Sequence, residues 1–237
     1  MERPHSGILV GTLMLACLLT TAMVAAYEPP DGAGRTSGRT VSFRRLGNGD
    51  IALGGIRLHH RARELSFAAR LHDAEYNRLE VLVATPCGRL HETLLCADIR
   101  PLHLQTMLYL LGLENGVRTP QSTMRQGAVL DIELEWTDAS GRCHREPVEN
   151  WIHDMRTGTN MARSGWIFVG SSVAHGVLQA GRQGNLVLLY CQGETILATA
   201  DSGGLRDTVF RVNHEKVDPG ITAKVRVFLT PRNSISQ

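Results

Sequence analysis

Residues 78–113 hold the longest apolar stretch of the chain after residue 26, and the spacing of their apolar positions changes along the way. In residues 78–85 large apolar side chains occupy every second position, which is typical of a β-strand with a buried face. Thr85-Pro86-Cys87-Gly88 follows, with proline and glycine at the second and fourth positions of a tight turn. The pattern predicts an antiparallel hairpin over residues 78–96.

The register of this hairpin determines where its polar side chains point. A three-residue loop would place His91 opposite Val83 and Thr93 opposite Val81. His91 and Thr93 would then share the inward face with the two valines, and Glu92 would point to the other face.

A helical pattern follows in residues 98–113. Asp98 can cap its start, and Pro101 falls in the first turn, where a missing N–H is harmless. Gly112 or Gly116 can end it. Burying large apolar side chains contributes about 1.5–3 kcal/mol each, so the hairpin and helix are expected to form the centre of the fold. An apolar stripe at helical spacing is predicted to pack on the inward face of the hairpin: Pro101, Leu104, Met107, Leu108 and Leu111.

Short alternating segments separated by turn-forming residues make up most of the remaining chain. They predict a mainly β (α+β) fold, either a β-sandwich or a partly open barrel of short strands, with one amphipathic helix packed on it. The three tryptophans are expected in its core. The expected strands are residues 41–46, 56–60, 64–71, 128–137, 145–152, 165–169, 184–191, 195–199 and 223–229.

Residues 1–26 have the pattern of a secretory signal peptide, with a basic residue before the apolar run Ile8–Ala25 and small residues at the cleavage site. Residues 27–40, rich in Pro, Gly, Ser and Thr, are expected to be a flexible tether, and residues 41–237 a single β-rich domain. Lipid attachment at Cys17 is an alternative, although the residues before it match a lipid-attachment box poorly. The mature chain is expected to be exported to the periplasm or cell surface, without a transmembrane anchor.

The formal net charge of +2 and the aromatic content of 5% narrow the range of partners. So small an excess of positive charge argues against nucleic acid or an anionic membrane as the main partner. Few aromatic rings argue against a base-stacking surface. An envelope protein or polymer is the expected class of partner.

Several motifs together resemble the YdjY-type domain of exported bacterial proteins. They are G-R-L-H-E-T-L-L, P-L-H-L-x-x-x-L-Y-L-L-G-L, E-N-W with R-T-G, S-G-W-I-F-x-G-S and D-T-V-F-R-V-N. The resemblance covers most of the chain from about Leu53 to the C-terminus. It implies an exported bacterial protein of a family without an established biochemical role, to which the label ferredoxin-like is sometimes attached.

The cysteines do not fit an iron–sulfur cluster. Cys87, Cys96, Cys143 and Cys191 are far apart in the sequence, and no C-x-x-C is present, whereas a cluster needs closely spaced thiolates. In an oxidising compartment four such cysteines are expected as disulfides or buried thiols, with three connectivities open. The predicted hairpin would hold Cys87 and Cys96 at opposite ends, which disfavours a bridge between them.

His91-Glu92-Thr93 lacks the second histidine of a zinc-peptidase motif and falls on a predicted strand. The favoured interpretation is a core histidine bonded to Thr93 or His103, with Glu92 on a solvated or partner-facing surface. A site for a transition metal or a proton between His91 and His103 is the alternative, and a bound metal ion stays open.

Three further candidates lie in the second half of the chain. Ser202 follows Asp201 in a sequence like a serine-protease nucleophile loop, but no companion histidine motif is present. Asp201 and Asp207 could jointly bind calcium, without the dense carboxylate spacing of a dedicated loop. Asn150 and Trp151 could line a ligand-binding cleft, because an indole offers a large surface and one N–H donor.

The favoured hypothesis is therefore an exported, non-catalytic binding or structural module of the bacterial cell envelope, because no nucleophile, metal motif or phosphate loop withstands inspection. A metal- or redox-associated periplasmic accessory protein is the first alternative. A hydrolase acting through Ser202 is the second.

Overall fold

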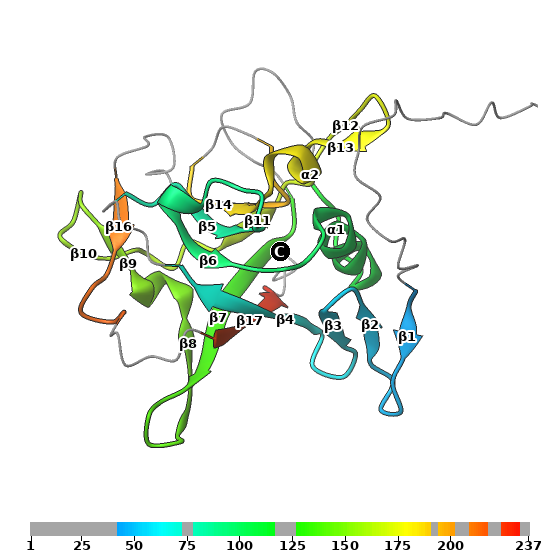
Figure 1. Cartoon of the computed structure of the whole chain (residues 1–237), viewed down its shortest axis with the longest axis horizontal. Helices are drawn as coiled ribbons and strands as arrows, with labels where there is room; N and C mark the ends of the chain where they lie inside the picture. Colours follow the sequence, from blue (N-terminus) through cyan, green and yellow to red (C-terminus); the bar gives the residue numbers. More distant parts are fainter. Residues whose placement is uncertain are drawn as a thin grey trace, which may run out of the picture. The chain divides into compact units, whose positions relative to one another are not determined.

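A mixed, eight-stranded β-barrel organises the chain (Figure 1). The computed structural model describes residues 42–72, 78–116, 127–190, 194–201, 209–217 and 224–232, so the expected signal peptide and tether lie outside the described residues. The expectation of a mainly β, barrel-like fold is confirmed. In order around the barrel the strands are β4 (Glu64–Leu71), β17 (Lys224–Pro231), β7 (Val129–Thr137), β11 (Trp166–Phe168), β15 (Leu197–Thr199), β14 (Asn185–Leu188), β5 (Val81–Ala84) and β6 (Thr93–Cys96), which returns to β4.

Shorter elements surround the barrel. Strands β1 (Arg44–Arg45), β2 (Ile51–Leu53) and β3 (Ile56–His59) extend the sheet from β4, and β8 (Cys143–Pro147) pairs with β7. The other strands are β9 (Ile152–Asp154), β10 (Thr159–Asn160), β16 (Phe210–Val212), β12 (Val173–Ala174) and β13 (Val177–Leu178). The helices are α1 (Pro101–Leu110) and α2 (Gln179–Gln183), with 3-10 turns η1 (Leu90–Glu92) and η2 (Val148–Trp151).

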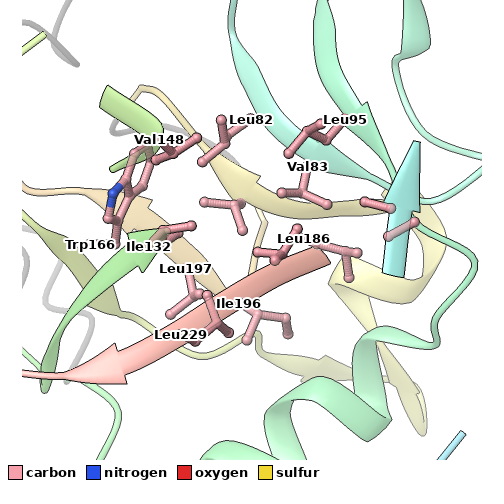
Figure 2. Packing of buried hydrophobic residues seen from close by; sticks show 14 of the residues in the cluster. Leu82, Val83, Leu95, Ile132, Val148, Trp166, Leu186, Ile196, Leu197 and Leu229 are labelled. Carbon is pink, nitrogen blue, oxygen red and sulfur yellow. The ribbon is translucent and has the colours of Figure 1, made fainter. Parts of the chain in front are cut away.

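Alternation along the strands separates the core from the outer face. On β7, Leu130, Ile132 and Leu134 are fully buried, while the acidic residues between them lie on the other side and are part-exposed. The inward side chains of different strands meet inside the barrel, as Figure 2 shows for Trp166, Leu186 and other core residues. Side chains therefore fill the barrel interior, so a ligand site has to be sought in its wall or at its ends.

The predicted hairpin over residues 78–96 is wrong, because β5 and β6 run parallel, with Val81 beside Thr93 and Val83 beside Leu95. The tight turn itself is present, since the Gly88 N–H donates to the Thr85 carbonyl at 2.9 Å. After it the chain passes through η1 and returns, so β6 starts level with the start of β5. All four residues of β5 are buried, which is typical of a parallel strand covered on both faces.

Helix α1 is present, but it begins later than predicted. Its N-cap is Arg100, and the exposed Asp98 does not cap it. The predicted apolar stripe is buried as expected, yet α1 packs against β3 and α2 and not across a hairpin. Leu102, Tyr109 and Leu110 on its other side are exposed, so the helix is less amphipathic than predicted. Within the described ranges, no helix is both long and apolar enough to cross a membrane.

Two glycines at helix ends allow a matched test of the contact that holds the Thr85–Gly88 turn. Gly184, with φ +70°, follows α2, and a Cβ there would lie 2.5 Å from the Gly88 nitrogen. Gly112, with φ +82°, follows α1 and has no neighbour within 4 Å of such a Cβ. Gly112→Ala is expected to cost about 1–2 kcal/mol of unfolding free energy for its left-handed backbone.

Gly184→Ala should cost about 1–3 kcal/mol more than Gly112→Ala, because the turn has to move away from the added methyl group. Urea unfolding of the two variants measures the difference. Equal losses would mean that the contact between Gly184 and the turn does not limit stability.

Candidate functional site

The predicted polar cluster of His91, Glu92, Thr93 and His103 is not assembled as expected. His91 lies in η1 with 64% of its side chain exposed, so its predicted inward position is wrong. The cause is the parallel return of the chain, which places His91 in a connection and not on a strand. Thr93 is buried and donates its hydroxyl to the Arg89 carbonyl at 2.6 Å.

His103 has surroundings different from those of His91. Its ring lies against Gly54 in the β2–β3 turn, and its buried Nδ1 has no hydrogen-bond partner among the described residues. Burial, and to a lesser degree Arg100, lower the pKa of His103. Among the described residues, no group of three or more His, Cys, Asp or Glu side chains is arranged to hold a metal ion.

Glu92 belongs instead to an ionic cluster that the sequence did not reveal. Arg89 donates from Nη1 to Glu80 Oε2 at 2.8 Å and from Nη2 to Tyr190 Oη at 2.6 Å. The same Nη1 lies 2.5 Å from Glu92 Oε1. Burial raises the pKa of Glu92, and Glu80 raises it further, against the opposing effect of Arg89 and His91. We call these four residues, Glu80, Arg89, Glu92 and Tyr190, the Arg89 cluster.

A pocket of about 530 Å³ opens at the other end of β5 and β6. Because these strands run parallel, their carboxyl ends meet, which brings Pro86 after β5 close to Cys96 and Asp98 at the end of β6. The pocket is lined by Ala68, Ala69, Arg70, Pro86, Cys96, Asp98 and Lys224.

The pocket lies at a gap in the ladder of β4. On one edge of β4, residues 64–67 pair with β3, and residues 70–71 pair with β6. Ala68 and Ala69 lie between these two ladders and pair with neither. Their small side chains leave the space open where β6 diverges from β4, and there the Ala97 N–H donates to the Ala84 carbonyl at 2.8 Å.

The backbone of Ala68 faces this gap. Amide groups alternate between the two edges along a strand. The His72 N–H donates to the Leu94 carbonyl on the β6 side at 2.9 Å, so the amide groups of Ala68, four residues earlier, point to that side as well. With the Ala68 amide groups on this side, the Ile56–Phe67 pairing places the Ala68 N–H opposite the Gly55 carbonyl, at the end of the β3 ladder. The Ala68 C=O lies beyond the last paired residues of both ladders. The pocket therefore offers the C=O acceptor of Ala68, at the point where the ladder of β4 is interrupted.

Charged groups of both signs surround this backbone position. Arg70 and Lys224 are exposed cations at the ends of β4 and β17, and Asp98 is an exposed carboxylate. The Cys96 thiol is half-buried, and burial raises its pKa, with Asp98 adding to this effect and Arg70 opposing it. The thiol is therefore held in its neutral, weakly nucleophilic form.

The described cysteines Cys87, Cys96 and Cys143 are free thiols, and Cys191 lies outside the described residues. The argument that placed Cys87 and Cys96 at opposite ends of a hairpin is wrong. Cys96 lies beside Ala84, next to the turn that carries Cys87.

The side chains of Trp151 and Asn150 both donate to one carboxylate, that of Glu146, and are not directed into an open cleft. Trp151 is fully buried and donates from Nε1 to Glu146 Oε1 at 2.7 Å, and Asn150 Nδ2 donates to Glu146 Oε2 at 3.0 Å. Asp201 is also buried and accepts from Arg156 Nη2 at 2.6 Å. Ser202 and Asp207 lie outside the described residues.

Comparisons with models of protein families, with curated proteins and with solved structures gave no match to this chain. The resemblance to the YdjY-type domain therefore stays a hypothesis.

Glu149, in η2, is the most deeply buried carboxyl group with an incomplete set of partners among the described residues. Its Oε1 accepts from Trp166 Nε1 at 3.0 Å, while Oε2 is buried without a partner. Burial is the largest influence and raises the pKa of Glu149, and Asp131 adds to it against Trp166 and Arg163. The folded state thus holds the proton more tightly than the unfolded state.

Because its folded-state pKa is raised, Glu149 should make unfolding easier as the pH rises above the ordinary carboxyl range. Glu149→Gln is expected to be more stable than the natural protein at neutral pH, with the difference disappearing below about pH 3, where Glu149 is protonated in both states. Urea unfolding across this pH range measures it. The exposed Glu215→Gln serves as the control, and a pH-independent difference for Glu149→Gln would contradict the assignment.

Proposed function

We infer that this protein is an exported, non-catalytic binding module of the bacterial cell envelope, and that it binds peptide-like ligands in the pocket between β4 and β6. The observation that carries this proposal is the open backbone position at Ala68, where the ladder of β4 is interrupted beside a cavity of about 530 Å³. Sites for small ligands typically measure about 300–1,000 Å³.

The chemistry of the lining selects the class of ligand. A C=O on a strand edge, outside both ladders, accepts most naturally from the N–H of another amide backbone, as in β-strand addition. The gap is too short to admit a whole strand, so a chain end or a short peptide fits it better. Arg70 and Lys224 favour a carboxylate, while Asp98 favours an ammonium or amide group.

The remaining lining supports binding and not catalysis. Ala68, Ala69 and Pro86 offer small apolar surfaces that suit short aliphatic side chains. The raised pKa of the Cys96 thiol disfavours the thiolate that a nucleophile requires. Export rests on the signal-like sequence of residues 1–26 and on the YdjY-type resemblance, and an envelope protein or polymer bearing peptide groups would be the natural partner.

No observation on the described residues favours the metal- or redox-associated alternative over this one, and the Ser202 hypothesis concerns a residue outside them. Both stay hypotheses from the sequence.

Tri-alanine tests the proposal, because its amides, methyl groups and free carboxylate match the pocket. Its addition to the isotope-labelled protein should shift the amide resonances of Ala68 and Cys96, whereas tri-alanine with an amidated C-terminus should bind more weakly. Lys224→Ala should weaken binding of the free acid by about threefold to tenfold, the effect of losing one charge-assisted hydrogen bond.

Arg61→Ala is the control, because Arg61 is exposed, lies in the turn between β3 and β4 and does not line the pocket. Ala68→Phe should fill the space and abolish binding. If tri-alanine shifts no pocket resonance at concentrations of about 10 mM, or if Lys224→Ala and Arg61→Ala behave alike, the proposed site is wrong.

A further inference from the structure

The connection between the parallel strands β5 and β6 links the pocket to the Arg89 cluster. We call residues 85–92 the β5–β6 crossover. Pro86, near its start, lines the pocket, and Arg89 and Glu92, near its end, belong to the cluster. One short segment therefore forms part of the pocket wall and also carries two of the four cluster residues.

Besides the side chains of the cluster, several backbone hydrogen bonds hold the crossover in place, among them the bond from the Glu80 N–H to the Glu92 carbonyl at 3.2 Å. The Thr85 N–H donates to the Gly184 carbonyl at 2.7 Å, and the Gly88 N–H donates to the Thr85 carbonyl at 2.9 Å. At the other end the Thr93 hydroxyl holds the Arg89 carbonyl. Arg89 adds a side-chain link from the crossover to the start of β5, through Glu80, and to the end of β14, through Tyr190.

The charges around Arg89 do not balance. Glu80 and Glu92 both face its guanidinium, and each carboxylate is largely buried, with 14% and 12% of the side chain exposed. The other groups that face Glu92 are His91, whose Nε2 is 3.9 Å from Glu92 Oε2, and Tyr190 across Arg89. With both glutamates ionised and His91 neutral, two negative charges share one positive charge in a partly desolvated site.

We propose that Glu92, which faces Glu80 at the Arg89 guanidinium, takes up one proton as the pH falls, and that this proton tightens the β5–β6 crossover and with it the wall of the peptide pocket. One proton converts two repelling carboxylates into a carboxyl–carboxylate pair that Arg89 can hold as a unit. The effect on the pocket rests on the proposed function, whereas the proton uptake does not.

The direction of the pH dependence follows from the protonation of Glu92. Its pKa is raised by burial first and by Glu80 second, against Arg89 and His91. The pair therefore stabilises the crossover at low pH, and this contribution is lost as the pH rises through the raised pKa. A well-ordered crossover favours peptide binding, because less order has to be gained when the peptide binds. Peptide affinity should therefore fall as the pH rises over the same range.

The free protein supplies the first measurement. The Glu92 carboxyl carbon and the Gly88 amide are followed by NMR between about pH 4 and pH 7.5, a range that spans ordinary carboxyl and imidazole pKa values. Both signals should titrate together in the natural protein. In Glu92→Gln the Gly88 transition should disappear, and in Glu80→Gln it should move to lower pH, because the repelling neighbour is gone.

His91→Gln is the matched control, since His91 is exposed and adjacent to Glu92 but is not a member of the pair. It should retain the Gly88 transition. If Gly88 does not follow Glu92, or if His91→Gln alone abolishes its transition, the proposal is overturned.

Titration of tri-alanine at both ends of the pH range supplies the second measurement. Affinity should fall by about threefold or more with rising pH in the natural protein and stay constant in Glu92→Gln. Equal affinity at both pH values, despite a titrating Gly88, would overturn the coupling to the pocket. Absence of tri-alanine binding at either pH would instead refute the proposed function, and the Gly88 titration would still decide whether the pair binds the proton.

Discussion

The parallel pairing of β5 with β6 is the constraint on which the arrangement of this barrel depends. Parallel strands start at the same end, so Glu80 and Glu92 come together there, and Pro86 and Cys96 come together at the opposite end. An antiparallel hairpin would have separated both pairs. The arrangement also requires a connection that returns along the length of the strands, and this connection becomes both a wall of the pocket and a member of an ionic cluster.

The sequence predicted much of the fold because alternation is a local signal. The mainly β barrel, the strands near residues 64–71 and 128–137, and the buried stripe of α1 follow from residue spacing alone. The direction of β6 did not, because Thr85–Gly88 makes a real turn in either topology, and the decisive contact is with Gly184, about a hundred residues away. Because the direction of β6 was predicted wrongly, the inward position of His91 and the packing of α1 across a hairpin were predicted wrongly as well.

The candidate site was harder to predict, because it too depends on contacts between residues that are far apart in the sequence. Alanine is not a functional residue type, and Ala68 matters here only because two ladders stop on either side of it. Arg89 likewise looks like a solvated loop residue until Tyr190, far along the chain, is placed beside it. One signal was available in advance: β5 is apolar at four consecutive positions, which favours a parallel strand and argues against a half-exposed hairpin.

The gap in β4 places several pocket residues on the outer face of the barrel, where they can be substituted without disturbing the core. Ala68, Arg70 and Lys224 are exposed, whereas the side chains that fill the barrel come from the inward positions of the same strands. Substitutions at Ala68, Arg70 and Lys224 therefore leave the inward-facing core side chains in place, whereas Ala69, which also lines the pocket, belongs to the core. On the proposed function, related barrels could bind different ligands by varying these few exposed residues, with little need for compensating mutations elsewhere.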